Sequence, residues 1–118
     1  MIWAIPFDGT LPKKYRNRKC MGKNWKKSFP NTANEEIRKF LILFTDAFAF
    51  SNKNKLKFEP EDKIMEIYRE LYPSKWMADS LEVETLANDL EKEYRINFNE
   101  MWHEELSLGE IFSKVKNA

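Results

Sequence analysis

The sequence predicts a mainly α-helical protein: a small four-helix bundle with an irregular basic segment packed on it. Three observations support this class. The chain has 118 residues, enough for one hydrophobic core and therefore one domain over 1–118. Apolar residues make up 42% of it and recur at helical spacing in four stretches. Three Gly and one Cys match neither a fibrous repeat nor a disulfide scaffold.

Residues 1–31 are expected to be irregular, because turn-forming residues such as Pro6, Pro12 and Pro30 interrupt them closely. Apolar side chains that include Trp25 and Phe29 indicate that this segment packs onto the body of the protein. The body is expected to comprise residues 32–118.

The first helix of the body is expected to start at Thr32. Thr32 and Glu35 have the spacing of a capping box, in which each side chain satisfies a free backbone N–H group of the first turn. Apolar positions then recur at helical spacing, which predicts a central helix that ends before Ser51; they are Ile37, Phe40, Leu41, Phe44 and Phe48.

Three further helices are expected. One follows Pro60, a residue favoured at the first helical position, and ends at Pro73. The next runs from Asp79 to about Tyr94. The last is capped by Ser107, with Glu110 completing a second capping box. The apolar positions of the three are Ile64, Ile67, Tyr68 and Leu71, then Val83, Leu86 and Leu90, then Leu108, Ile111, Phe112 and Val115.

The net charge of +1 hides a strong asymmetry between the halves. Residues 1–58 carry thirteen Lys and Arg against four Asp and Glu, and residues 59–118 carry seven against fifteen. One interpretation is that the halves fold together and neutralise each other. The alternative is that residues 13–27 bind nucleic acid, with cations for the phosphates and an aromatic ring for the bases. The residues of that alternative are Lys13, Lys14, Arg16, Arg18, Lys19, Trp25, Lys26 and Lys27.

Residues 76–116 resemble the acyl carrier protein family. The resemblance rests on Asp79-Ser80-Leu81 at a helix start, on Leu86, Leu90 and Tyr94 in register behind it, and on an extended link through Phe98. The loop before the motif, residues 73–78, is short for that family. The resemblance implies an acyl-carrier-like bundle.

The resemblance also implies a chemistry. Ser80 would carry a 4'-phosphopantetheine arm, with Asp79 beside it, and a helix N-terminus would favour the attached phosphate. Acidic residues of the following helix would recruit basic partner enzymes: Glu82, Glu84, Asp89, Glu91 and Glu93. The simpler interpretation is that Asp79 and Ser80 only cap the helix.

No motif of an enzyme stands out, and we expect no catalytic residue, no metal site and no cofactor unless Ser80 is modified. The split charge, the exposed carboxylates and the tryptophans instead favour a non-catalytic protein-binding module, such as an immunity protein, an antitoxin or an adaptor. Trp76 and Trp102 join the acidic helix as candidate contact residues. The expected partner is a protein, such as a basic toxin or enzyme, rather than nucleic acid or a membrane. The expected compartment is the cytoplasm.

Overall fold

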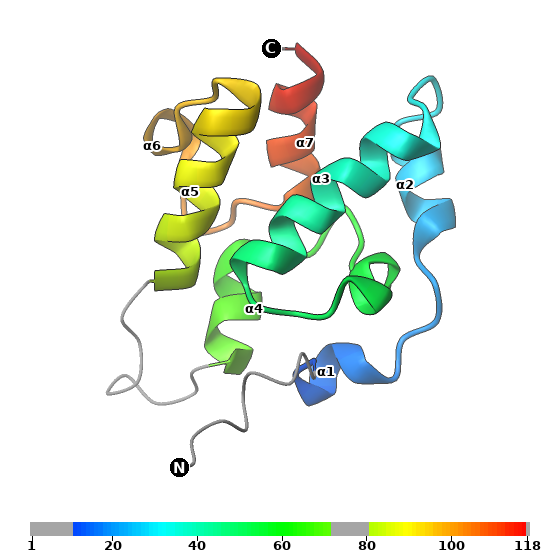
Figure 1. Cartoon of the computed structure of the whole chain (residues 1–118). Coiled ribbons are helices and arrows are strands. Elements are labelled where there is room, and N and C mark those ends of the chain that lie inside the picture. The colour runs from blue at the N-terminus through cyan, green and yellow to red at the C-terminus, as the bar shows by residue number, and fades with distance from the viewer. Residues whose placement is uncertain (1–10, 72–80, 118) are drawn as a thin grey trace.

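The structure, a computed structural model, describes residues 11–71 and 81–117. It confirms the mainly α-helical class, and these two ranges contain no strand (Figure 1). The helices in order are α1 (Lys13–Arg16), α2 (Gly22–Ser28), α3 (Asn34–Ala47), the 3-10 helix η2 (Asn52–Lys57), α4 (Ile64–Leu71), α5 (Leu81–Tyr94), α6 (Phe98–Met101) and α7 (Leu108–Asn117). None of these helices is long and apolar enough to span a bilayer.

Helix α3 is the centre of the molecule. In Figure 1, α5 and α6 lie on one side of it and α2 lies on the other. Its predicted apolar positions are buried and contact η2 and α5, which explains why a helix apolar on several sides is stable here. The predicted start at Thr32 is wrong. Thr32 is buried, the helix begins at Asn34, and the N-cap Ala33 has no side chain that can accept a hydrogen bond.

The core is built largely from aromatic rings. Trp25 of α2 packs edge-on against Phe112 of α7, with ring centroids 5.8 Å apart, and Phe40 of α3 lies 5.2 Å from the same Phe112 ring. A second group forms around Phe58, which packs edge-on against Phe44 at 4.9 Å. Rings from four separate segments therefore share one core, as expected for a single domain.

Residues 11–31 are not irregular throughout, since α1 and α2 both form within them. Each of these short helices buries one aromatic side chain, Tyr15 in α1 and Trp25 in α2. The indole N–H of Trp25 donates a hydrogen bond to the carbonyl of Phe58 at 2.8 Å. Helices of four and seven residues are unstable alone, so this anchoring holds them in place.

The segment before α4 pairs with the segment before α7. The backbone N–H of Ile64 donates to Leu106, and that of Gly109 donates to Pro60, at 2.9 and 2.8 Å. Pro60 therefore does not start a helix as predicted; α4 begins at Ile64. A Cβ added to Gly109 would lie 2.9 Å from the backbone oxygen of Pro60, so the close approach requires glycine.

The start of α7 agrees with the sequence. The backbone N–H of Glu110 donates to the Ser107 hydroxyl, and the backbone N–H of Ser107 donates to the Glu110 carboxylate, both at 3.1 Å. This reciprocal pair is the predicted capping box. The predicted boundaries at Pro73, Asp79 and Ser80 lie outside the described residues.

Candidate functional site

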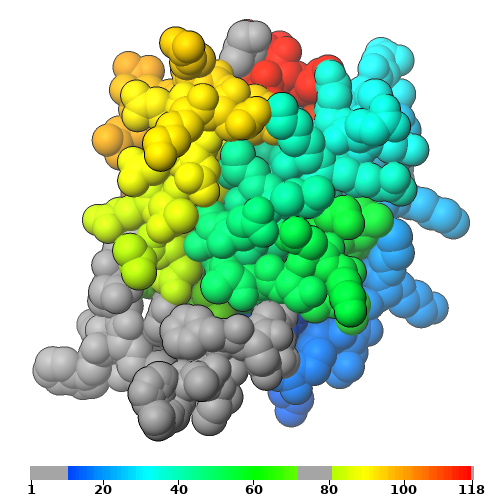
Figure 2. All heavy atoms as spheres, viewed as in Figure 1, coloured from blue at the N-terminus to red at the C-terminus, as the bar shows by residue number. Residues whose placement is uncertain are grey.

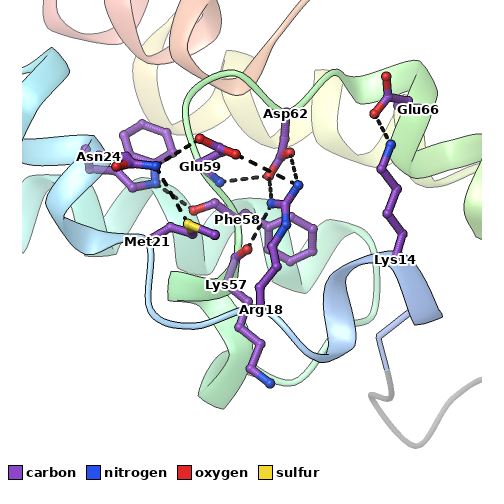
Figure 3. A network of polar contacts seen from close by, with 10 residues as sticks. Lys14, Arg18, Met21, Asn24, Lys57, Phe58, Glu59, Asp62 and Glu66 are labelled. Atoms are coloured by element: carbon purple, nitrogen blue, oxygen red, sulfur yellow. Dashed lines mark hydrogen bonds and ion pairs between the residues drawn. The ribbon is translucent and has the colours of Figure 1, made fainter.

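The basic N-terminal segment docks on the loop between η2 and α4 (Figure 3). Arg18 donates two hydrogen bonds to the Asp62 carboxylate, at 2.6 and 2.9 Å, and a third to the carbonyl of Lys57 at 3.1 Å. Asp62 is only 5% exposed, and it also accepts the backbone N–H of Glu59 at 2.8 Å. These bonds raise the pKa of Arg18, with the Asp62 contact the largest cause. A bidentate pair this deeply buried fixes the position of the segment.

Two more contacts reinforce this docking. Lys14 pairs with Glu66 of α4, and this hydrogen bond lowers the pKa of Glu66. The guanidinium of Arg18 lies over the Tyr15 ring, 4.8 Å from its centroid. Burial, followed by the charge of Asp62, raises the pKa of Tyr15, and its buried hydroxyl has no hydrogen-bond partner among the described residues.

Several residues of the predicted nucleic-acid surface are buried or make contacts within the molecule. Trp25 is buried in the core, so no base can stack on it in this conformation. Lys14 and Arg18 pair with carboxylates, and Arg16 donates to the carbonyl of Leu11. Lys26 donates to the carbonyl of Thr32 at 2.6 Å. The remaining three, Lys13, Lys19 and Lys27, are exposed.

The five acidic residues of α5 do not form one face. Glu82, Asp89 and Glu93 share one side, because seven and eleven residues are close to whole numbers of turns; Glu84 and Glu91 lie on roughly the opposite side. Buried Leu86 and Leu90 lie between the two stripes.

The first of these stripes faces α3, which lies beside α5 on the face shown in Figure 2. Glu93 pairs with Lys39 of α3 at 2.8 Å, and this contact raises the pKa of Lys39. Asp89 and Glu93 also line a shallow groove of about 330 Å³ with Asp46 of α3. Part of the predicted acidic surface therefore contacts α3 of the same molecule instead of being wholly free for a partner.

Trp102 is the one predicted contact tryptophan among the described residues, and its side chain is accessible, as are those of Glu84 and Glu91 on α5. Trp102 is 38% exposed and lies directly after α6, with its ring 5.6 Å from that of the buried Phe98. Asn97 caps α6 by accepting the backbone N–H of Asn99 at 3.0 Å, which fixes the backbone around both rings.

Carboxylates surround this position in the sequence: Glu100, Glu104, Glu105 and Glu110, all exposed. Glu105 pairs with Lys63, and Glu110 contacts His103 at 3.1 Å. Glu100 and Glu104 have no ion-pair partner in residues 11–71 and 81–117. We call Trp102, Phe98 and these four carboxylates the Trp102 surface.

Other predicted residues are not placed. Ser80, Asp79 and Trp76 lie outside the described residues, so phosphopantetheine on Ser80 remains a prediction from the sequence. The described helix α5 begins at Leu81, directly after that serine.

One groove was not predicted from the sequence. It lies between α2 and α3, measures about 480 Å³, and is lined by Lys23, Lys26 and Lys27 of α2 and by Arg38 of α3. Lys26 and Lys27 belong to the predicted nucleic-acid surface, but the sequence carries no signal that would bring Arg38 opposite them. Among the described residues, no three His, Cys, Asp or Glu side chains are grouped so as to hold a metal ion.

Comparisons with known proteins found no match to the chain among family models, curated proteins or solved structures.

Proposed function

We propose that the protein is a non-catalytic protein-binding module that binds a basic partner through the Trp102 surface. The observation that carries the proposal is an exposed tryptophan supported from below by a buried ring, with unpaired carboxylates beside it in the chain. Tryptophan is enriched among the residues that dominate the energy of protein interfaces, because it buries a large area with few rotatable bonds.

The local geometry supports this use of Trp102. Phe98 is 5% exposed and belongs to the core, so the tryptophan ring rests on a fixed base. A ring held in this way loses little conformational freedom when a partner covers it. The other large exposed apolar side chain of the described residues is Leu81, at the start of α5. It lies about 20 Å along the helix axis from the end of α5 at Tyr94, after which the chain leads to α6 and Trp102.

The charge of the surface suggests the chemistry of the partner. Glu100 and Glu104 are free to meet cations of another protein, and their negative potential would steer a basic surface toward Trp102. An immunity protein, an antitoxin and an adaptor would each fit this description, and the proposal does not choose among them.

The test compares three tagged forms of the protein in pull-downs from the native host: the wild type, Trp102→Ala and Leu81→Ala. The expected result is a basic protein recovered in stoichiometric amount by the wild type and Leu81→Ala, and lost with Trp102→Ala. With purified components, Trp102→Ala is expected to weaken binding by about thirtyfold, the effect of losing roughly 2 kcal/mol.

Two controls make the result decisive. Thermal unfolding of Trp102→Ala checks that the variant is folded; a modest loss of stability is expected, because the ring packs against Phe98. Glu100→Gln with Glu104→Gln should slow association and reduce its dependence on salt. Recovery of no stoichiometric partner, or equal recovery by Trp102→Ala, contradicts the proposal.

A further inference from the structure

The groove between α2 and α3 has a basic rim and a partly apolar floor. Lys23, Lys26, Lys27 and Arg38 line it, together with the side chains of Ile37 and Leu56. No Asp or Glu is among its lining residues. Its volume of about 480 Å³ is within the range of small-molecule sites. This groove involves none of the residues of the Trp102 surface.

The cations of the groove are not neutralised by the protein. Lys23, Lys27 and Arg38 have no ion-pair partner in residues 11–71 and 81–117, whereas Lys14, Arg18, Lys39, Lys63 and Lys116 all have one. Lys23, Lys26 and Lys27 are three and four positions apart on one short helix, so they repel one another. An anion in the groove would remove this repulsion.

The positions of these cations are set by the fold. Trp25 anchors α2 through its hydrogen bond to Phe58, and Lys26 is held by the carbonyl of Thr32. Arg38 projects from α3, the central helix, one turn after Asn34, which also lines the groove.

The geometry points to a binding site for a small amphipathic anion, in which an apolar body lies over Ile37 and Leu56 and a phosphate or carboxylate group contacts Lys23, Lys27 and Arg38. Arginine binds such oxyanions through two parallel N–H groups, and lysine binds them as a point charge. The apolar floor favours an organic anion over a bare inorganic one. Because Trp25 is buried, the groove offers no exposed ring on which nucleic-acid bases could stack.

Cys20 provides a direct assay, because it is exposed, lines the groove and is the only cysteine of the chain. The experiment measures the rate at which iodoacetamide alkylates Cys20 in the presence of naphthyl phosphate, naphthoate, naphthol or inorganic phosphate. Calorimetry gives the affinity of each probe. Both organic anions are expected to protect Cys20 and to bind at least about tenfold more tightly than naphthol or inorganic phosphate. Protection by only one of the two anions identifies the head group and still supports the site.

The variants test the assigned cations. Lys27→Ala and Arg38→Ala are each expected to weaken binding of the organic anions by about tenfold. The control, Lys13→Ala with Lys114→Ala, removes two exposed lysines outside the groove and should leave the affinity within about twofold of the wild type. Thermal unfolding of each variant checks that it is folded.

Four outcomes overturn the proposal. The first is that naphthol binds as tightly as the anions, which would show that charge is not recognised. The second is that none of the probes protects Cys20. The third is that Lys27→Ala and Arg38→Ala bind the organic anions as tightly as the wild type does. The fourth is that oligothymidylate or polyglutamate protects Cys20 at lower concentrations than the small anions do, which would assign the groove to a macromolecular chain.

Discussion

Asp62 combines several polar contacts with almost complete burial. Its two oxygens accept hydrogen bonds from Arg18 and from the backbone of Glu59, so both act only as acceptors, as an ionised carboxylate does. A buried ion pair adds little compared with an apolar pair, but removal of one partner leaves the other buried without compensation. The consequence is that Asp62 and Arg18 are needed together.

We therefore expect Asp62→Asn to lower the free energy of unfolding by about 3 kcal/mol, because it leaves the partly buried Arg18 with only the more distant Glu59 carboxylate, 3.9 Å away. The matched control is Glu61→Gln, the same chemical change at the neighbouring exposed position. It should change stability by less than about 0.5 kcal/mol. Urea unfolding of both variants makes the measurement, and equal stabilities would contradict the role assigned to Asp62.

Tyr15 lies beside this pair, and its hydroxyl is buried without a hydrogen-bond partner among the described residues. Tyr15→Phe keeps the ring beneath Arg18 and removes the unsatisfied group, so the free energy of unfolding should stay the same or rise by up to about 1 kcal/mol. A loss of stability in Tyr15→Phe would instead show that the hydroxyl has a hydrogen-bond partner.

The same residue predicts a response to alkaline pH. Burial raises the pKa of Tyr15 above its ordinary value of 10.0. The unfolded chain therefore releases this proton first, so the stabilisation is complete below pH 10.0 and is lost as the pH rises toward the folded-state value. The wild type should lose more stability above pH 10.0 than Tyr15→Phe, as measured by urea unfolding over that range.

At the level of secondary structure, the pairing between the segments before α4 and α7 depends on Gly109. Gly109→Ala would place a Cβ against the backbone of Pro60, and backbone cannot move aside easily. We expect a loss of about 2 kcal/mol in the free energy of unfolding. Gly22→Ala is the matched control, since its nearest neighbour would be the Cys20 sulfur at 3.4 Å, an ordinary contact. Comparable losses in the two variants would contradict the assigned close approach.

Helices with a long apolar stripe were predictable from the sequence, and α3 and α7 are examples. The Ser107 and Glu110 capping box could also be predicted, because it depends only on local spacing. The apparent box at Thr32 failed because that residue is buried and the helix begins two residues later. Local spacing is therefore informative only where the side chain stays at the surface.

Helices α1 and α2 could not be predicted, because they are short, rich in lysine and carry no periodic stripe. They depend on Tyr15 and Trp25, whose burial sites are built by residues far along the chain. The α2–α3 groove could not be predicted for the same reason, since residues far apart in the sequence line it. Trp102 could be predicted as a contact residue from its residue type. That its ring packs on Phe98 could be seen only in the folded structure.

In the whole molecule, the basic and acidic halves of the sequence meet through ion pairs, of which Lys14 with Glu66, Arg18 with Asp62 and Lys39 with Glu93 are described. The aromatic core joins the same halves, since Trp25 contacts Phe112. Residues 11–31 are therefore part of the domain and not an appendage.

This arrangement predicts one cooperative unfolding transition. The indole N–H signal of Trp25 in NMR spectra and the far-ultraviolet circular dichroism of the helices should change at the same urea concentration. An earlier change at Trp25 would show that α1 and α2 detach before the helical body unfolds.

Segment 57–64 has a further consequence, which concerns the rate of folding. It binds Arg18, 44 residues away in the case of Asp62, and it also pairs with residues 106–109 on its other side. Both contacts close long loops. The conformational entropy of these loops is lost before the core forms and its contacts compensate for the loss. Such non-local contacts slow folding, so this helical protein should fold more slowly than bundles whose helices contact only their sequence neighbours.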